Sequence, residues 1–261
     1  MSTVRTHFHV TTGWQFAFTA LLKQYLHRKR SEPRSRDFKS PVTVTLIAAV
    51  AADTQIPLSV RTAVLVAYDG LLRPQDYTCS RAKSFVPLTT LLCEDVVWNA
   101  SGFGLRIKHS KSDPYNKGMF QPFVARTRDK FCPVVFVRAY MAQAPLSHVQ
   151  GQPFFVKHTS KGVSFVTPAD ITAALRKHAH IDGVPASSIS ARSLRSAGAY
   201  QMANHNQSWE AIRVRGRWAF DPSSHMVVMY ARTGLDRLQQ QADSRTIEGA
   251  SRSSLWLLPA G

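Results

Sequence analysis

Residues 190–230 combine side chains that are suited to phosphate chemistry. Arg192 and Arg195 are three positions apart, so a helix would place them on one face. Trp218 offers an indole N–H donor, and Tyr230 offers a phenol that can act as a covalent nucleophile. A guanidinium matches phosphate oxygens with two parallel hydrogen bonds and keeps its charge at any working pH. This segment therefore predicts metal-free chemistry on a phosphate.

The elements that must position these arginines are helices with recognisable caps. Ser190 is expected to begin a helix on which Leu194, Ala197, Gly198 and Met202 form one apolar stripe, which would leave Arg192 and Arg195 on a face off the core. Ser208 is expected to cap the next helix, which Gly216 ends. After Ser223, a further short helix would bring Tyr230 back over the arginines.

An earlier segment adds another arginine at the end of an apolar helix. Pro57 begins this segment, the helix is expected from Arg61 to Leu72, and Pro74 is expected to stop or bend the chain just after Arg73. The helix dipole favours a cation at a C-terminus, so a purely structural role for Arg73 stays open at this point.

Residues 83–126 show short alternating runs separated by Gly, Asn and Pro, which predicts a small antiparallel sheet. The expected strands are Phe85–Leu88, Asp95–Trp98, Gly104–Lys108 and Gln121–Val124. The remaining expected elements are a helix over Val42–Ala52 capped by Ser40, a helix from Cys132 to Gln143, a short strand over Phe154–Val156, and a helix capped by Thr167 that runs to His178.

The charge balance of the 261 residues points to a polyanionic partner. Lys and Arg number 33 against 16 Asp and Glu, which gives a net charge of +17 and a pI near 10.4. Nucleic acid is the first candidate, because a membrane-surface protein should also carry a long basic amphipathic helix. On charge alone, RNA binding stays open. The basic run around Arg28, Lys29 and Arg30 could grip phosphates, act as a nuclear address or be a solvated linker.

Three cysteines, an odd number without a CxxC pair, argue against a disulfide framework and a zinc site. No run of 18 apolar residues and no secretory signal is present, so we expect a soluble intracellular protein. The 44% of hydrophobic residues can fill a core.

The C-terminal residues resemble the signature of the tyrosine recombinases and phage-type integrases. That pattern is His-x-x-Arg, then His or Trp about two dozen residues later, then the nucleophilic Tyr. Here Trp218 follows Arg195 by 23 residues, and Tyr230 follows Trp218 by 12. Arg192 stands where the family usually has histidine.

Two upstream motifs of the family also have counterparts. The sequence LLRPQDY, with Arg73 and Asp76, resembles the family's first box, and HSKSD resembles its common Ser-Lys-Thr-Asp sequence. The second match favours Lys111 over Lys108 as the lysine that reaches the phosphate. Since all these motifs fall in order, the resemblance favours a catalytic role for Arg73 over the structural one.

The resemblance implies that Tyr230 attacks a DNA phosphate and forms a 3′-phosphotyrosyl bond, without a metal or any other cofactor. Arg73 and Arg195 would hold the non-bridging oxygens, Trp218 would donate to one of them, and Lys111 would protonate the leaving 5′-oxygen. Asp76 would orient Arg73, and Arg192 would bind phosphate without acting as a general base. Further DNA contacts are expected from Arg28, Lys29, Arg30, Lys108, Arg213, Arg215 and Arg217.

The implied fold is α+β and mostly helical, a catalytic domain over residues 41–234 in which helices pack with a small antiparallel sheet. Residues 1–40 would be a helix and basic linker left from a core-binding domain, and residues 235–261 a C-terminal helix and tail. The expected partners are double-stranded DNA and further copies of the chain on it, with no membrane and no small-molecule cofactor. The LLRPQDY and GRW sequences resemble those of recombinases from eukaryotic mobile elements. The expected location is the nucleus if the host is a eukaryote and otherwise the cytoplasm. A non-catalytic DNA-binding protein that kept this fold is the leading alternative.

Overall fold

The computed structural model describes residues 41–79, 85–108, 118–126, 128–143, 151–160 and 162–218. All of them belong to one compact unit of the chain. Its helices are α2 (Val44–Ala52), α3 (Leu58–Asp69), α4 (Pro74–Tyr77), α5 (Pro133–Gln143), α6 (Pro168–Lys177), α7 (Ser193–Asn204) and α8 (Trp209–Gly216). Its strands are β1 (Val96–Asn99), β2 (Gly102–Ile107), β3 (Met119–Val124), β4 (Val156–Thr159) and β5 (Gly162–Phe165). Short 3₁₀ turns lie at Cys93–Asp95, Ala179–Asp182 and Ala186–Ser188.

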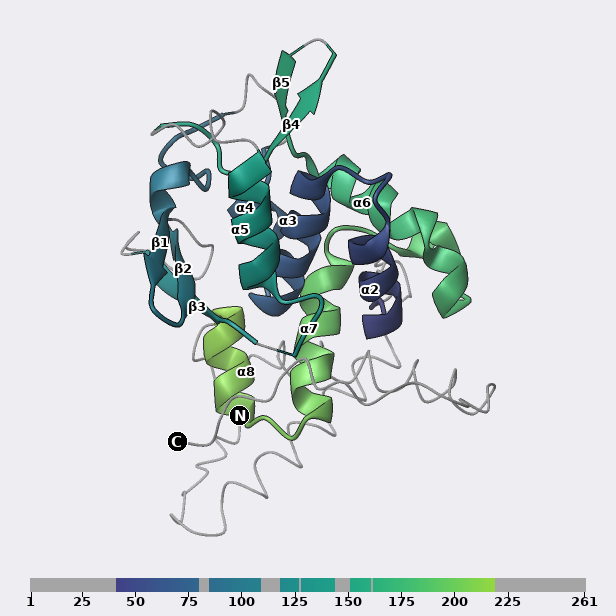
Figure 1. Cartoon of the computed structure of the whole chain (residues 1–261). Helices are drawn as coiled ribbons and strands as arrows, with labels where there is room; N and C mark the ends of the chain where they lie inside the picture. The colour runs from purple at the N-terminus through teal and green to yellow at the C-terminus, as the bar shows by residue number, and fades with distance from the viewer. Residues whose placement is uncertain are drawn as a thin grey trace, which may run out of the picture. The chain divides into compact units, whose positions relative to one another are not determined.

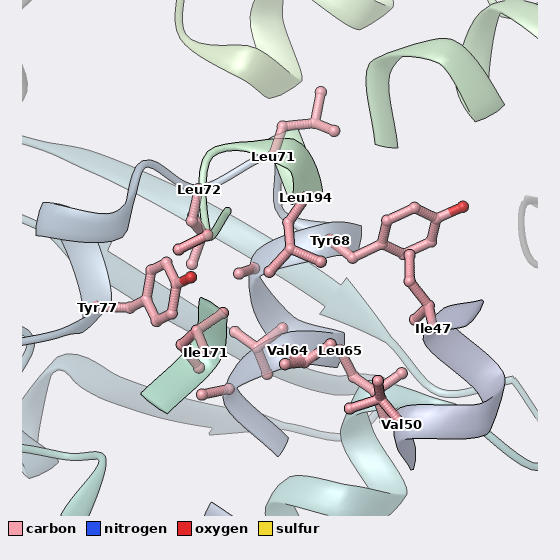
Figure 2. Close-up of a cluster of buried hydrophobic side chains, with 14 of the residues drawn as sticks. Ile47, Val50, Val64, Leu65, Tyr68, Leu71, Leu72, Tyr77, Ile171 and Leu194 are labelled. Atoms are coloured by element: carbon pink, nitrogen blue, oxygen red, sulfur yellow. The ribbon is translucent and has the colours of Figure 1, made fainter. Parts of the chain in front are cut away.

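Helix α3 forms the centre of this unit. Apart from Leu58 and Arg61, all its residues are buried, as expected for a helix that is apolar on nearly every side. Helices α2, α5, α6 and α7 all contact it (Figure 1). Figure 2 shows side chains of α3 meeting Ile47 and Val50 from α2, Ile171 from α6 and Leu194 from α7. Helix α3 is therefore held by helices on several sides, and the residues that follow it begin at a well-packed element.

The ends of α3 differ from the prediction of Arg61–Leu72. The helix begins at Leu58, directly after Pro57, and it ends at Asp69. Leu71 then adopts a left-handed conformation with φ of 48°, which stops the helix before Pro74 is reached. Pro74 instead begins α4, where its missing N–H is no loss because the first helical N–H groups have no partner in the helix.

The predicted antiparallel sheet is present, with the order β1-β2-β3. Phe103 of β2 faces Phe123 of β3 in the register, and their rings stack with centroids 4.6 Å apart. The sheet lies on the α5 side of the unit (Figure 1). The predicted strand over Phe85–Leu88 is wrong, because this segment is a turn in which the Val86 carbonyl accepts from the amides of Thr89 and Thr90.

A second, two-stranded sheet is formed by β4 and β5. The sequence predicted a strand at Phe154–Val156, but pairing starts only at Val156, and β5 was not predicted. Phe154 and Phe155 lie in the hydrophobic core instead, where Phe154 donates its amide to the Leu91 carbonyl.

Local capping explains the helices whose starts were predicted well. Thr167 caps α6 and Ser208 caps α8, and α5 covers Pro133–Gln143 as expected. Helix α2 is capped by Thr43 rather than Ser40, because the Thr43 hydroxyl accepts from the Leu46 amide at 3.2 Å. Among the described residues, no helix is long and apolar enough to cross a membrane.

Candidate active site

The turn between α3 and α4 provides the first part of the site. Its Leu71 carbonyl lies beside two guanidinium groups, and its left-handed backbone is uncommon for a residue with a branched side chain. Arg73, half-buried, precedes α4 and donates its backbone N–H to the Asp76 carboxylate at 2.7 Å. Asp76 itself is 4% exposed. The turn therefore presents a carbonyl, a carboxylate and an arginine within six residues of one another.

Arg195 of α7 connects this turn to the end of α8. One guanidinium nitrogen donates to the Leu71 carbonyl at 2.6 Å, and the other donates to the Gly216 carbonyl. The guanidinium carbon lies 4.3 Å from the centroid of the Trp218 ring, in the geometry of a cation–π contact. Three segments that are far apart in the sequence thus meet at one arginine.

The expectation that Arg192 and Arg195 share a face off the core is wrong. Arg192 is exposed at the start of α7, whereas Arg195 is 4% exposed. Helix α7 is buried on nearly all sides, because Gly198 lets it approach α3 closely: a Cβ atom there would lie 2.3 Å from the Tyr68 carbonyl oxygen. Ser190 does not cap α7 either, since the helix starts at Ser193 and no side chain caps it.

The end of α8 supplies the third part of the site. Arg217 adopts a left-handed conformation with φ of 54° and donates from its guanidinium to the Asp76 carboxylate. Burial lowers the pKa of Arg217, against the influence of Asp76, and the positive charge of Arg73 lowers it further. Trp218 is 7% exposed and packs on Gly216, where a Cβ atom would lie 1.7 Å from the indole ring. Only glycine leaves room for this ring.

The carboxylate of Asp76 is bound differently from the expectation. It was predicted to orient the Arg73 guanidinium, and its contacts in the structure go to the Arg73 backbone N–H and to the Arg217 guanidinium. This role of Arg217 was not predicted from the sequence. Arg217 directly precedes Trp218 of the signature, and this position next to a signature residue is the signal that could have suggested a role in the site.

Four of the residues predicted to contact DNA lie in the described part of the chain, and each of them is bound to groups of the protein itself. Lys108 pairs with Asp95 at 2.7 Å, and Arg213 pairs with Glu210. Arg215 pairs with Asp69 at 2.7 Å. Arg217 is buried, with 4% exposed, rather than presented on the surface as a DNA contact requires. The DNA contacts of Lys108, Arg213 and Arg215 stay predictions.

Several predicted residues lie outside the described part of the chain. They are Arg28, Lys29, Arg30, Lys111 and Tyr230. The described part brings together Arg73, Asp76, Arg195 and Trp218. It places Arg192 on the surface at the start of the same helix as Arg195.

The arrangement concentrates positive charge at a place of low exposure. The guanidinium groups of Arg195 and Arg217 share the Leu71 carbonyl, and Arg73 is close enough to act on the pKa of Arg217. The positive potentials of these groups add and are weakly screened by water at a buried place, so the arrangement favours an anion such as a phosphate. Within the described residues, no group of three or more His, Cys, Asp or Glu side chains is arranged to hold a metal ion.

No family model and no curated protein matches this chain. Among solved structures, the chain is similar to the XerH site-specific recombinase bound to palindromic difH substrate in a post-cleavage complex, with a TM-score of 0.53 and 12% identity over 79% of this chain and 53% of XerH. The pre-cleavage complex of XerH with difH gives a TM-score of 0.51 and 12% identity over 78% and 52%. The chain thus spans about half the length of these structures. It has the fold of a tyrosine recombinase catalytic domain.

Proposed function

We propose that this chain breaks and rejoins DNA strands in site-specific recombination or integration, through a 3′-phosphotyrosyl intermediate on Tyr230. The observation that carries the proposal is the bond from Arg195 to the Leu71 carbonyl, which joins residues 124 positions apart. It brings the helix of the signature to the turn of the first box, with Trp218 beside it. A chance match of short motifs gives no reason for them to meet in space.

The proposed roles follow from the chemistry of each group. Tyr230 attacks the phosphorus and displaces a 5′-hydroxyl, so the phosphotyrosine conserves the bond energy and no high-energy cofactor is needed. Arg73 and Arg195 stabilise the charge on the non-bridging oxygens, and Trp218 donates an indole N–H. Lys111 gives its proton to the leaving oxygen.

Arg192 has a different part in the proposal. It is exposed and, as an arginine, stays protonated, so it can hold a phosphate but cannot take a proton from Tyr230. The phenol proton then passes to water or to the phosphate itself. The reaction proposed here is for that reason slow, with tight binding of DNA.

The proposed partners are double-stranded DNA and further copies of the chain assembled on it. A net charge of +17 supports a polyanionic partner. The proposed place of action is the nucleus in a eukaryotic host and otherwise the cytoplasm.

Trapping on a nicked duplex tests the proposal. Cleavage next to a nick releases a short fragment, so the covalent protein–DNA complex accumulates and resists SDS. The wild-type chain is expected to form this adduct, and Tyr230→Phe to bind DNA equally well without forming it. Tyr200→Phe is the matched control, because this half-buried tyrosine of α7 is outside the proposed chemistry. An adduct that persists with phenylalanine at position 230 would show that another residue is the nucleophile.

One observation favours a second candidate, a DNA-binding protein without catalysis. Arg195 is 4% exposed, and both of its terminal nitrogens donate to carbonyls of the protein. In this alternative the arginine has become a structural link. Salt-sensitive binding of duplex DNA without any SDS-resistant adduct would establish it.

A further inference from the structure

Asp69 occupies a position that is unfavourable by local rules. It is the last residue of α3, where the negative end of the helix dipole opposes a carboxylate, and it is 2% exposed. A buried carboxylate is costly unless cations and hydrogen-bond donors surround it. The contacts of Asp69 must therefore compensate for this unfavourable position.

Two arginines surround this carboxylate. Arg126 donates to one carboxylate oxygen at 2.9 Å, and Arg215 donates to the other at 2.7 Å. Arg215 also donates its Nε–H to the backbone carbonyl of Asp69 at 2.9 Å, and Arg126 pairs with Asp129 at 2.9 Å. The positive charge of Arg126 and Arg215 thus meets the negative charge at the end of α3 from two directions.

The two arginines come from different elements. Arg126 follows β3, and Arg215 is in the last turn of α8. Arg215 also donates to the Pro122 carbonyl of β3 at 3.1 Å. Asp69 and Arg215 therefore fasten β3 and α8 to the end of α3.

Apolar packing supports the same junction. The guanidinium of Arg215 lies 5.5 Å from the centroid of the Phe123 ring. That ring also packs on Gly70, where a Cβ atom would lie 2.7 Å from its edge. Strand β3 thus contacts Gly70, the first residue after Asp69. A shift of the end of α3, of β3 or of Arg215 would therefore disturb the packing of the other two.

Two of the fastened segments lead to a group of the proposed mechanism. Asp69 stands four positions before Arg73, and Arg215 stands three before Trp218. We propose that Asp69 is a positioning residue, which fixes the placement of strand β3 and of the two segments that bear Arg73 and Trp218 relative to one another. This inference rests on the proposed function.

The test compares two isosteric changes in the full chain. Asp69→Asn removes the charge at the junction, and Asp53→Asn is the matched control, because Asp53 also pairs with two basic side chains, Lys177 and His178, in another part of the unit. Single-turnover cleavage of the nicked duplex should slow by about 10- to 100-fold for Asp69→Asn, while the Kd for DNA stays within about twofold. Asp53→Asn should leave both quantities unchanged. A change of rate without a change of Kd separates positioning from a general loss of folded protein.

Equal cleavage rates for wild type and Asp69→Asn would overturn the inference. If Asp69→Asn does not fold, Arg126→Lys takes its place under the same criteria, because it keeps a positive charge beside Asp69 but cannot bond Asp69 and Asp129 together as the guanidinium does.

A second measurement keeps the two proposals distinguishable. If the wild type forms no adduct, the proposed function fails, and amide hydrogen exchange then decides the role of Asp69. The amides of Leu72, Trp218 and Gln121 report on the three segments. Joint loss of their protection in Asp69→Asn, with none in Asp53→Asn, supports the fastening. Unchanged protection overturns it.

Discussion

Helices α6 and α7 have similar lengths, but they are positioned by different interactions. Helix α6 begins at a capping box in which Thr167 and Asp170 satisfy each other's backbone amides, and basic residues occupy its last turn. Its buried residues Ile171, Ala174 and Leu175 lie on one face. Helix α7 has no side-chain cap, is buried on nearly all sides and carries Arg195 inside.

The difference separates two ways in which a sequence specifies a helix. Every feature that fixes α6 is within a few residues of it, so α6 can be read locally. Helix α7 is fixed by contacts with Leu71, Gly216 and the backbone of α3. Local rules are broken where the candidate site is built, which is where functional demands are expected to override them.

The strongest test of this comparison is Gly198→Ala in α7. Alanine is the better helix former, so local propensity predicts a gain of up to about 1 kcal/mol in the free energy of unfolding. The added Cβ would instead meet the Tyr68 carbonyl oxygen at 2.3 Å and Leu71 at 2.4 Å. We expect a loss of about 3 kcal/mol in urea unfolding, because α7 would have to move away from α3.

Helix α6 provides the control for that change. Ala173 is exposed there, so Ala173→Gly should follow propensity alone and cost about 1 kcal/mol. A Gly198→Ala variant more stable than wild type would remove the distinction between the two helices.

The next effect in size concerns the two arginines of the signature. Arg195→Lys keeps the charge, but one ammonium cannot reproduce the fork that joins Leu71 to Gly216, nor the flat contact with Trp218. With a buried carbonyl left unsatisfied, we expect a loss of about 2 kcal/mol. Arg192→Lys, on the exposed start of the helix, should change the free energy of unfolding by less than about 0.5 kcal/mol. Equal losses at both positions would contradict the buried placement of Arg195.

Much of the fold was predictable because its signals are local. The caps Thr167 and Ser208 and the helix after Cys132 agree with the structure. The end of α3 could not be predicted in the same way, because Leu71 turns in a left-handed conformation and its carbonyl is bound by an arginine 124 residues away. Phe85–Leu88 is a short apolar run like those of many strands, but whether such a segment pairs depends on partners that the segment does not contain.

In the described part of the chain, the sequence predicted several residues of the candidate site but not their contacts. The signature pointed to Arg195 and Trp218 and the first box to Arg73, and the structure brings these segments together. The partner of Asp76 was missed, because Arg217 is 141 residues away in the sequence and reaches the carboxylate only through the fold. The sequence did contain a local signal for Asp69, because a carboxylate stands at the C-terminal end of a helix, where a cation is favoured. A residue that departs from a local rule in this way is a candidate for a special role.

The smallest expected effect returns to α6 and depends on pH. Asp170 accepts from the Thr167 hydroxyl at 2.7 Å and from the Lys157 ammonium at 2.6 Å. Burial raises the pKa of Asp170, but the bonds from Lys157 and Thr167 outweigh it and hold the pKa below the ordinary value of 3.8.

A carboxyl whose pKa is lower in the folded chain stabilises the fold above its unfolded pKa, and this contribution is lost as the pH falls through the folded value. Asp170→Asn keeps an acceptor for the cap but removes the charge. At about pH 6 it should therefore lower the free energy of unfolding by less than about 1 kcal/mol, because the pair is partly exposed. Below about pH 4 the difference from wild type should shrink. The loss from Gly198→Ala is steric and should stay level over the same range. A pH-independent loss at Asp170 would show that its shape in the capping box, and not its charge, supports α6.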